Sequence, residues 1–182
     1  MARRPAARLD EEGLWKYALR ALGGRDHSVA ELRDKLRRRA AQSAQVETVL
    51  RRLKQAGYLN EPRFAVAFAA ARRDSQGLGQ SRVLRDLRRK RVAPAVAEKA
   101  VREVYREIDE VALIEGYLER KFRRTPLAEY LGDQRRLASV YRKLRLAGFS
   151  SGNSIRVLRR YSEQAQELAE TEEDEQSSWP SS

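Results

Sequence analysis

The sequence has no cysteine and only one histidine among its 182 residues. Without cysteine the chain can form neither disulfides nor thiolate metal sites, and such a composition fits a reducing compartment. A single histidine, His27, also leaves no pair of imidazoles to hold a zinc ion. We therefore expect no metal and no cofactor.

Long apolar runs are missing as well. No uncharged stretch approaches the roughly 20 residues that cross a bilayer, and the basic first residues lack the apolar segment of a signal peptide. We expect a soluble, cytoplasmic protein that does not associate with membranes.

Catalytic motifs are also absent. The sequence contains no GxxxxGK[ST] loop and no HExxH pair, which excludes the common nucleotide-hydrolysing and metalloprotease patterns. Gly77 and Gly79 lack the third glycine of a dinucleotide-binding loop, so we interpret them as a break between two helices. His27 directly precedes a predicted helix cap, which explains it without catalysis. We predict that the protein is not an enzyme.

Charge is plentiful but uneven. The chain has 38 basic and 26 acidic residues, a net charge of +12. Seven of the acidic residues and none of the basic ones follow Ser162, so residues 1–161 carry a net charge of +19. A body this basic attracts polyanions, and the partner could be nucleic acid or an acidic protein surface.

Apolar residues follow one pattern three times, with identical spacing inside each copy. The copies are offset by 51 and then 57 residues. Their members are Leu32, Leu36, Ala41, Val49, Leu50, Leu53; Val83, Leu87, Val92, Ala100, Val101, Val104; and Val140, Leu144, Phe149, Val157, Leu158, Tyr161. A period of this size is typical of stacked helical units that bury their apolar faces against each other. We predict an all-α fold of three tandem three-helix repeats that form an elongated, curved array.

Local signals place the helices within these repeats. Ser28 and Glu31 form a predicted capping box, Gly57 supplies a left-handed helix end, and Asn60 can cap the next helix. Phe64, Ala67, Phe68 and Ala71 are predicted to form the buried face of that helix. The predicted divisions are a flexible N-terminus (1–13), three repeats (14–59, 60–106 and 107–161) and an acidic, disordered tail (162–182) that contains Trp179.

Basic runs recur near the end of the second helix of each repeat. The candidates for contact with a partner or with DNA are Arg37, Arg38, Arg39, Arg88, Arg89, Lys90, Arg91, Arg142, Lys143 and Arg145. Guanidinium groups bind phosphates and carboxylates through two hydrogen bonds at once, so a stripe of them suits either ligand. For any single arginine, an ordinary solvated helix face is the favoured explanation. For the stripe as a whole we favour a binding function.

The turn GYLNEPRFA, Gly57–Ala65, together with the later Arg72, Gly77 and Gly79, resembles the RecX family of recombinase regulators. The resemblance extends over about residues 14–161. Two positions depart from the family pattern: Glu61 stands where Asp is usual, and Arg91 stands where a helix-ending glycine is common. Within the turn, we expect Tyr58, Leu59 and Phe64 to pack the joint between repeats, which leaves Arg63 as an exposed candidate for binding.

The resemblance implies a monomer that binds the RecA–DNA filament in its groove and inhibits the ATPase, strand-exchange and coprotease activities of RecA. Such a protein acts in homologous recombination, DNA repair and the SOS response. Contact with single-stranded DNA would be weak or made through the filament. The alternative is a basic helical module that binds nucleic acid directly, with second or third helices as the reading elements. The sequence leaves open whether inhibition proceeds by end capping, disassembly or groove blocking.

Overall fold

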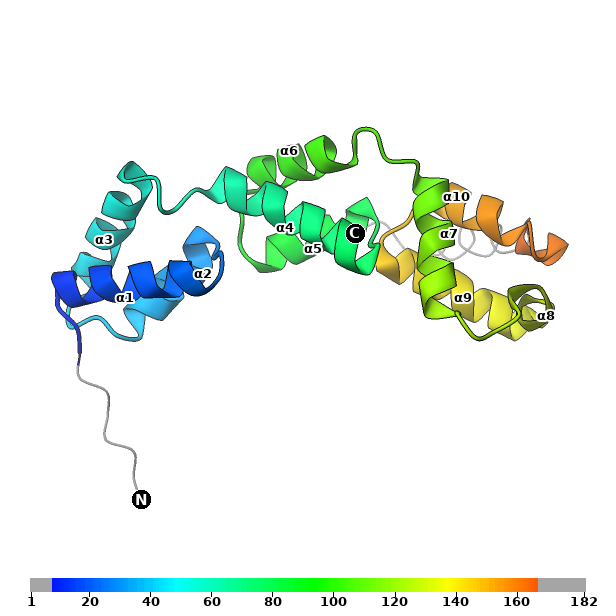
Figure 1. The fold of residues 1–182 in the computed structure, drawn as a ribbon, viewed down its shortest axis with the longest axis horizontal. Coiled ribbons are helices and arrows are strands. Elements are labelled where there is room, and N and C mark those ends of the chain that lie inside the picture. Colours follow the sequence, from blue (N-terminus) through cyan, green and yellow to red (C-terminus); the bar gives the residue numbers. More distant parts are fainter. Residues whose placement is uncertain (1–7, 167–182) are drawn as a thin grey trace, which may run out of the picture. The chain divides into compact units, whose positions relative to one another are not determined.

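The computed structural model describes residues 8–166, which form ten α-helices and one short 3-10 helix (Figure 1). The helices are α1 (Glu11–Gly24), α2 (Val29–Arg37), α3 (Ser43–Gln55), α4 (Glu61–Gln76), α5 (Gln80–Arg89), α6 (Pro94–Tyr105), α7 (Glu110–Lys121), α8 (Leu127–Leu131), α9 (Gln134–Ala147) and α10 (Ser151–Leu158), followed by η1 (Glu163–Gln166). In this range no strand is present, and the only bridge pairs Leu9 with Ala40. The predicted all-α, tandem three-helix fold is confirmed. None of these helices has the length and apolar character needed to span a bilayer.

The chain divides into two compact units. The N-terminal unit comprises Met1–Ala69 and Asp86–Glu103, and the C-terminal unit comprises Ala70–Arg85 and Val104–Ser182. The division passes through α4, α5 and α6, so it does not follow the predicted repeat boundaries. The assignment of three repeats to 14–59, 60–106 and 107–161 stays a prediction.

In the N-terminal unit, α1, α2 and α3 enclose one apolar core. Its fully buried members include Leu14, Leu32, Leu36 and Leu53. The chain enters α1 earlier than predicted, because the Asp10 side chain accepts a hydrogen bond from the Gly13 amide and caps a helix that begins at Glu11. Together with the Leu9 bridge, this cap makes residues 9–13 part of the folded unit rather than of a flexible N-terminus.

The start of α4 agrees with its predicted cap, whereas its predicted buried face is partly wrong. The Asn60 side chain accepts a hydrogen bond of 2.9 Å from the Arg63 amide. Phe64 is buried, but Ala67 and Ala71 are exposed, and the fully buried alanines are Ala65 and Ala69 instead. The core-facing side of α4 is therefore rotated from the predicted one, which leaves apolar side chains on its outer surface.

In the C-terminal unit, α7, α9 and α10 surround a second core. Ile114, Leu118, Leu137, Leu144 and Phe149 are among its fully buried members. Residues 125–133 contain the short helix α8. The first residues of the predicted acidic tail form η1, whose Ala165 is fully buried in this core. The rest of that tail, with Trp179, lies outside the described residues.

The repeated apolar pattern is buried at most positions, with one shift. Ala41 is exposed, and its neighbour Ala40 is buried instead. The backbone explains this shift, because Leu9 donates to the Arg39 carbonyl and accepts from the Ala41 amide, which turns Ala40 inward. The last member of the second and third copies, Val104 and Tyr161, is only partly buried.

Candidate binding surface

The predicted basic candidates near the end of α2 are exposed, but they are not equivalent. Arg37 lies 3.8 Å from a Glu47 carboxylate oxygen, and Arg39 lies over the Tyr17 ring at 5.6 Å from its centroid. Arg38 has no side-chain hydrogen bond or ion pair within the described part of the chain. Surface pairs of this kind contribute little stability. All three arginines are therefore accessible to a polyanion.

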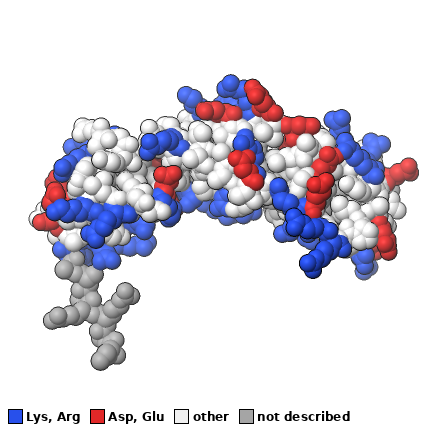
Figure 2. All heavy atoms as spheres, viewed as in Figure 1, with Lys and Arg blue, Asp and Glu red and all other residues white. Residues whose placement is uncertain are grey.

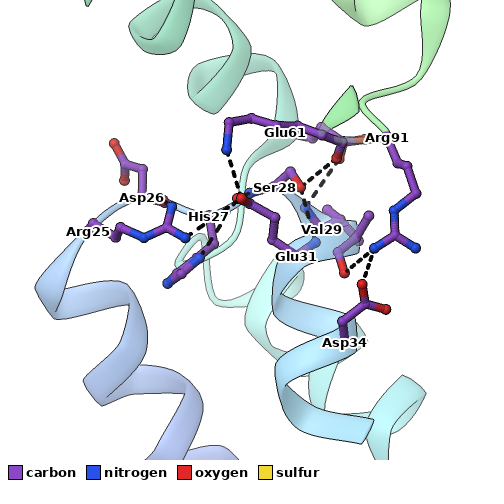
Figure 3. A network of polar contacts seen from close by, with 11 residues as sticks. Arg25, Asp26, His27, Ser28, Val29, Glu31, Asp34, Glu61 and Arg91 are labelled. Carbon is purple, nitrogen blue, oxygen red and sulfur yellow. Dashed lines mark hydrogen bonds and ion pairs between the residues drawn. The ribbon is translucent and has the colours of Figure 1, made fainter. Parts of the chain in front are cut away.

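Lys90 and Arg91, in contrast, make contacts inside the N-terminal unit, and Figure 3 shows those of Arg91. Lys90 Nζ donates to Glu31 Oε1 at 2.7 Å, and its carbonyl accepts from Ser28 Oγ at 2.8 Å. Arg91 donates to the Asp34 carboxylate and to the Ala30 carbonyl. These contacts attach the turn after α5 to the first turns of α2. Both side chains therefore have contacts within the fold, but the Lys90 side chain is 22% exposed whereas that of Arg91 is 59% exposed.

Arg91 also has unusual backbone geometry. Its φ of +56° lies in the left-handed region that favours glycine. Its amide donates to the Arg88 carbonyl and the Val92 amide to the Leu87 carbonyl, the two bonds of a Schellman helix end. The resemblance noted in the sequence placed a glycine at this position, and the backbone agrees with that expectation although the residue is arginine.

Arg88 and Arg89 lie on the exposed side of α5. Arg88 is 3.5 Å from Glu98, and Arg89 is 3.7 Å from Asp86. Both arginine side chains remain more than half exposed. Arg91 is exposed to a similar extent, and Lys90 is the member of the second basic run that is mostly covered.

The third basic run, on α9, is divided in the same way. Arg142 is exposed, and its side chain has no hydrogen bond or ion pair among the described residues. Lys143 lies 5.8 Å from the centre of the Phe122 ring, and Arg145 donates to the Phe149 carbonyl at 2.6 Å. The three runs therefore do not share one pattern of exposure, even though they share a sequence position.

Basic side chains that the repeat pattern missed gather on α10. Arg156 and Arg159 line a hollow of about 690 Å³ together with Ser151 and Ile155. Arg160 lines it too, but pairs with Glu115. These arginines could have been found from the amphipathic pattern of the helix, since they alternate with the buried Ile155, Val157 and Leu158. Figure 2 shows basic side chains in separate groups on the face drawn, with acidic side chains between several of them.

Burial and charge shift the titration of two groups beneath this surface. His27 is 3% exposed, and burial followed by the positive charges of Arg25 and Lys35 lowers its pKa, against a smaller opposing effect of Glu31. Burial raises the pKa of Glu31, but the hydrogen bond from Lys90 and that from the Ser28 amide outweigh it and lower the pKa. His27 Nδ1 is 3.8 Å from Glu31, too far for a hydrogen bond. At neutral pH the site therefore holds a neutral histidine beside an ionised glutamate.

The GYLNEPRFA turn is divided between packing and exposure. Leu59 and Phe64 are buried as predicted, whereas Tyr58 is 53% exposed and meets the edge of the Trp15 ring at 6.1 Å between centroids. Arg63 is exposed, and only its backbone amide has a partner in the described residues. In the same part of the chain, no group of three or more acidic or histidine side chains is arranged to hold a metal ion.

Two family descriptions and several named relatives match this chain. The family description "RecX, first three-helix domain" matches residues 15–53, and "RecX, second three-helix domain" matches residues 60–101. The chain is 31% identical over 138 residues to Regulatory protein RecX of Syntrophotalea carbinolica, covering 75% of this chain and 88% of that protein. It is 40% identical over 100 residues to Regulatory protein RecX of Deinococcus radiodurans, covering 54% and 47% of the two chains.

A solved structure agrees in fold. The crystal structure of RecX from Lactobacillus salivarius superposes with a TM-score of 0.70 at 18% identity, covering 83% of this chain and 96% of that one. The sequence match to the Syntrophotalea protein extends over nearly the whole of that relative. The chain therefore belongs to the RecX family.

Proposed function

We propose that this chain is a non-enzymatic regulator of the RecA recombinase, which binds the RecA–DNA filament and restrains its ATPase, strand-exchange and coprotease activities. The observation that carries this proposal is membership of the RecX family, in which the matched relatives bear the name regulatory protein. The exposed arginines on α2 and α5 support it, because a basic surface speeds approach to an anionic filament.

The decisive experiment is the single-stranded-DNA-dependent ATPase of the cognate RecA, with this protein added from substoichiometric amounts up to one per RecA protomer. Inhibition at amounts too small to coat the DNA supports action on the filament. Inhibition only at DNA-saturating amounts contradicts it. The assay is repeated at several salt concentrations. For binding to DNA phosphates, the logarithm of the binding constant falls linearly with the logarithm of the salt concentration.

The basic side chains can be tested by charge reversal. Replacing Arg88 and Arg89 by Glu reverses two exposed members of the second run and leaves Arg91, which contacts Asp34, in place. We expect weaker filament binding with little change in the free energy of unfolding. Unchanged inhibition by this double variant would show that the run on α5 is not part of the binding surface.

A second candidate function is direct nucleic-acid binding by α10. The hollow beside Arg156 and Arg159 favours it, because neither side chain has an ion pair among the described residues. Footprinting on bare DNA separates the two functions. Protection of particular sequences in the absence of RecA would favour direct binding and contradict the filament as the primary target.

A further inference from the structure

The N-terminal unit has an apolar groove between α4 and α6, which run beside each other in Figure 1. The groove has a volume of about 720 Å³, and its apolar lining includes Pro62, Val66, Ala67, Ala95 and Val96. Pro62, Ala67 and Ala95 are exposed, so this lining lies on the surface rather than in the core. Grooves between two helices commonly accept a further amphipathic helix.

The groove is a consequence of how α4 is rotated. Its core-facing residues are Phe64, Ala65 and Ala69, which already anchor the helix in the unit. Ala67 is exposed, opposite to its predicted orientation, and Val66 is half-buried. Small side chains at Ala67 and Ala95 also allow a partner helix to approach the backbone closely.

The charge at the rim indicates what kind of segment the groove accepts. Arg63 and Lys99 line it, both are exposed, and neither side chain has an ion pair or hydrogen bond within the described residues. Glu103 is the one carboxylate that lines it. An occupant with carboxylates beside its apolar face would pair with the two cations. A nucleic acid fits less well, because no aromatic ring among the described lining residues offers a base a stacking surface.

We infer that the α4–α6 groove binds an amphipathic helix of the protein partner, apolar on the side that enters the groove and acidic along its flank. The inference rests on the proposed function, so the partner is RecA in its filament. Arg63 and Lys99 orient the helix by pairing with its carboxylates, while Val66, Ala67 and Val96 supply the buried contact. In this arrangement the groove recognises the protein partner, whereas the basic runs on other helices attract phosphate.

The absence of cysteine from the chain allows a direct test. Single-cysteine variants Ala67→Cys and Ala95→Cys report from inside the groove, and Ala71→Cys, which is exposed on α4 but does not line the groove, is the matched control. The rate of maleimide labelling of each variant is measured alone, with poly(dT), and with RecA assembled on poly(dT). We expect the filament to slow labelling at 67 and 95 about tenfold when nine-tenths of the chain is bound, and to leave 71 nearly unchanged.

Each variant is first tested for inhibition of the RecA ATPase, so that a failure of the proposed function is seen separately. Inhibition without protection at 67 and 95 overturns the groove and leaves the function standing. Protection by poly(dT) alone, or by an excess of the cysteine-free protein without RecA, also overturns it, because nucleic acid or a second copy would then be the occupant.

Charge reversal gives an independent measurement. The double variant Arg63→Glu, Lys99→Glu is compared with Arg51→Glu, Lys54→Glu, which changes the net charge equally at exposed positions of α3. We expect the groove variant to bind the filament about tenfold more weakly than the control variant, a difference of about 1.4 kcal/mol. Equal binding by the two variants would mean that Arg63 and Lys99 act only through the net charge of the chain, and would overturn the inference.

Discussion

Two junctions, one in each unit, hold a serine-capped helix against the first residue of another helix. In the N-terminal unit Ser28 caps α2, and the Val29 amide donates to Glu61 at the start of α4. In the C-terminal unit Ser150 caps α10, and its amide donates to Glu110 at the start of α7. The two junctions use the same device to satisfy free amides at a helix N-terminus.

The junctions differ in the groups that complete them. The N-terminal junction contains Lys90, Arg91 and the buried His27, whereas in the C-terminal junction Glu110 accepts from the neutral Ser150 hydroxyl and Asn153 amide. Each lies beside a left-handed helix end, at Arg91 with φ +56° and at Gly148 with φ +95°. In the C-terminal junction Arg145 of the third basic run donates to the Phe149 carbonyl, and its charge helps to lower the pKa of Glu110. The comparison teaches that basic runs take part in the fold of both units, through ion pairs with acidic side chains in one and beside neutral hydrogen-bond donors in the other.

The largest effect is expected at Gly148, the left-handed end of α9 in the C-terminal unit. In Gly148→Ala a Cβ atom would lie 2.3 Å from the Arg82 amide nitrogen, in addition to the cost of a left-handed alanine. We expect the free energy of unfolding to fall by about 3 kcal/mol, measured by urea denaturation. Gly152→Ala is the control, because a Cβ there meets nothing within 4 Å and the change should cost no stability.

The next prediction compares the stability that Glu110 and Glu61 contribute to their junctions. Glu110→Ala leaves the Ser150 amide and the Asn153 side chain without their acceptor, and we expect a loss of about 2 kcal/mol. Glu61→Ala removes one longer bond of 3.2 Å and should cost less than half as much. Thermal melting of both variants measures the difference, and equal losses would contradict it.

Glu110 should also give the C-terminal junction an acid-sensitive component. Burial raises its pKa, but the hydrogen bonds from Ser150 and Asn153 outweigh burial and lower the pKa below 4.5. The stability it contributes is therefore present above about pH 4.5 and lost as the pH falls through the lowered value. In Glu110→Gln this part of the pH dependence of the urea midpoint should disappear.

Substitutions of Arg91 test how much the left-handed backbone costs at the end of α5, where the end of α9 has Gly148. Arg91→Gly and Arg91→Ala both remove the contact with Asp34, but only glycine relieves the left-handed backbone. We expect the glycine variant to be more stable than the alanine variant by about 1 kcal/mol in urea denaturation. An alanine variant as stable as the glycine variant would mean that the turn changes conformation on substitution.

The smallest effect concerns pH near neutrality and belongs to the N-terminal junction alone. Because the pKa of His27 is lowered by folding, the unfolded chain binds a proton more readily, and stability falls as the pH drops below about 6.5. The urea midpoint of the wild-type chain should decrease between pH 7.5 and 5.5. His27→Gln should lessen that decrease, since the sequence holds no other histidine.

Local features of the fold could be predicted from the sequence, because their partners are a few residues apart. The capping box of Ser28 with Glu31, the cap at Asn60 and the left-handed Gly57 are all present as predicted. Periodicity of buried residues then sufficed for the fold class.

Long-range pairing could not be predicted in the same way. The sequence placed Lys90 and Arg91 in an exposed stripe, because nothing local indicates that Glu31 and Asp34 lie opposite them. The exchange of Ala41 for Ala40 likewise depends on the pairing of Leu9 with that turn. The exposure of Arg38, Arg63 and Arg142 follows from the fold, and their contacts with a partner stay a prediction.

The N-terminal junction also bears on how the chain folds during synthesis. Ser28 and its partner Lys90 are 62 residues apart, and Asp34 and Arg91 are 57 apart. When α1, α2 and α3 have left the ribosome, Glu31 can pair with Arg25 but still lacks Lys90, and Asp34 still lacks Arg91. The contacts of Lys90 and Arg91 with α2 can form only after the end of α5 has been translated. A pause in translation ahead of Lys90 would therefore prolong the time during which α2 lacks these contacts.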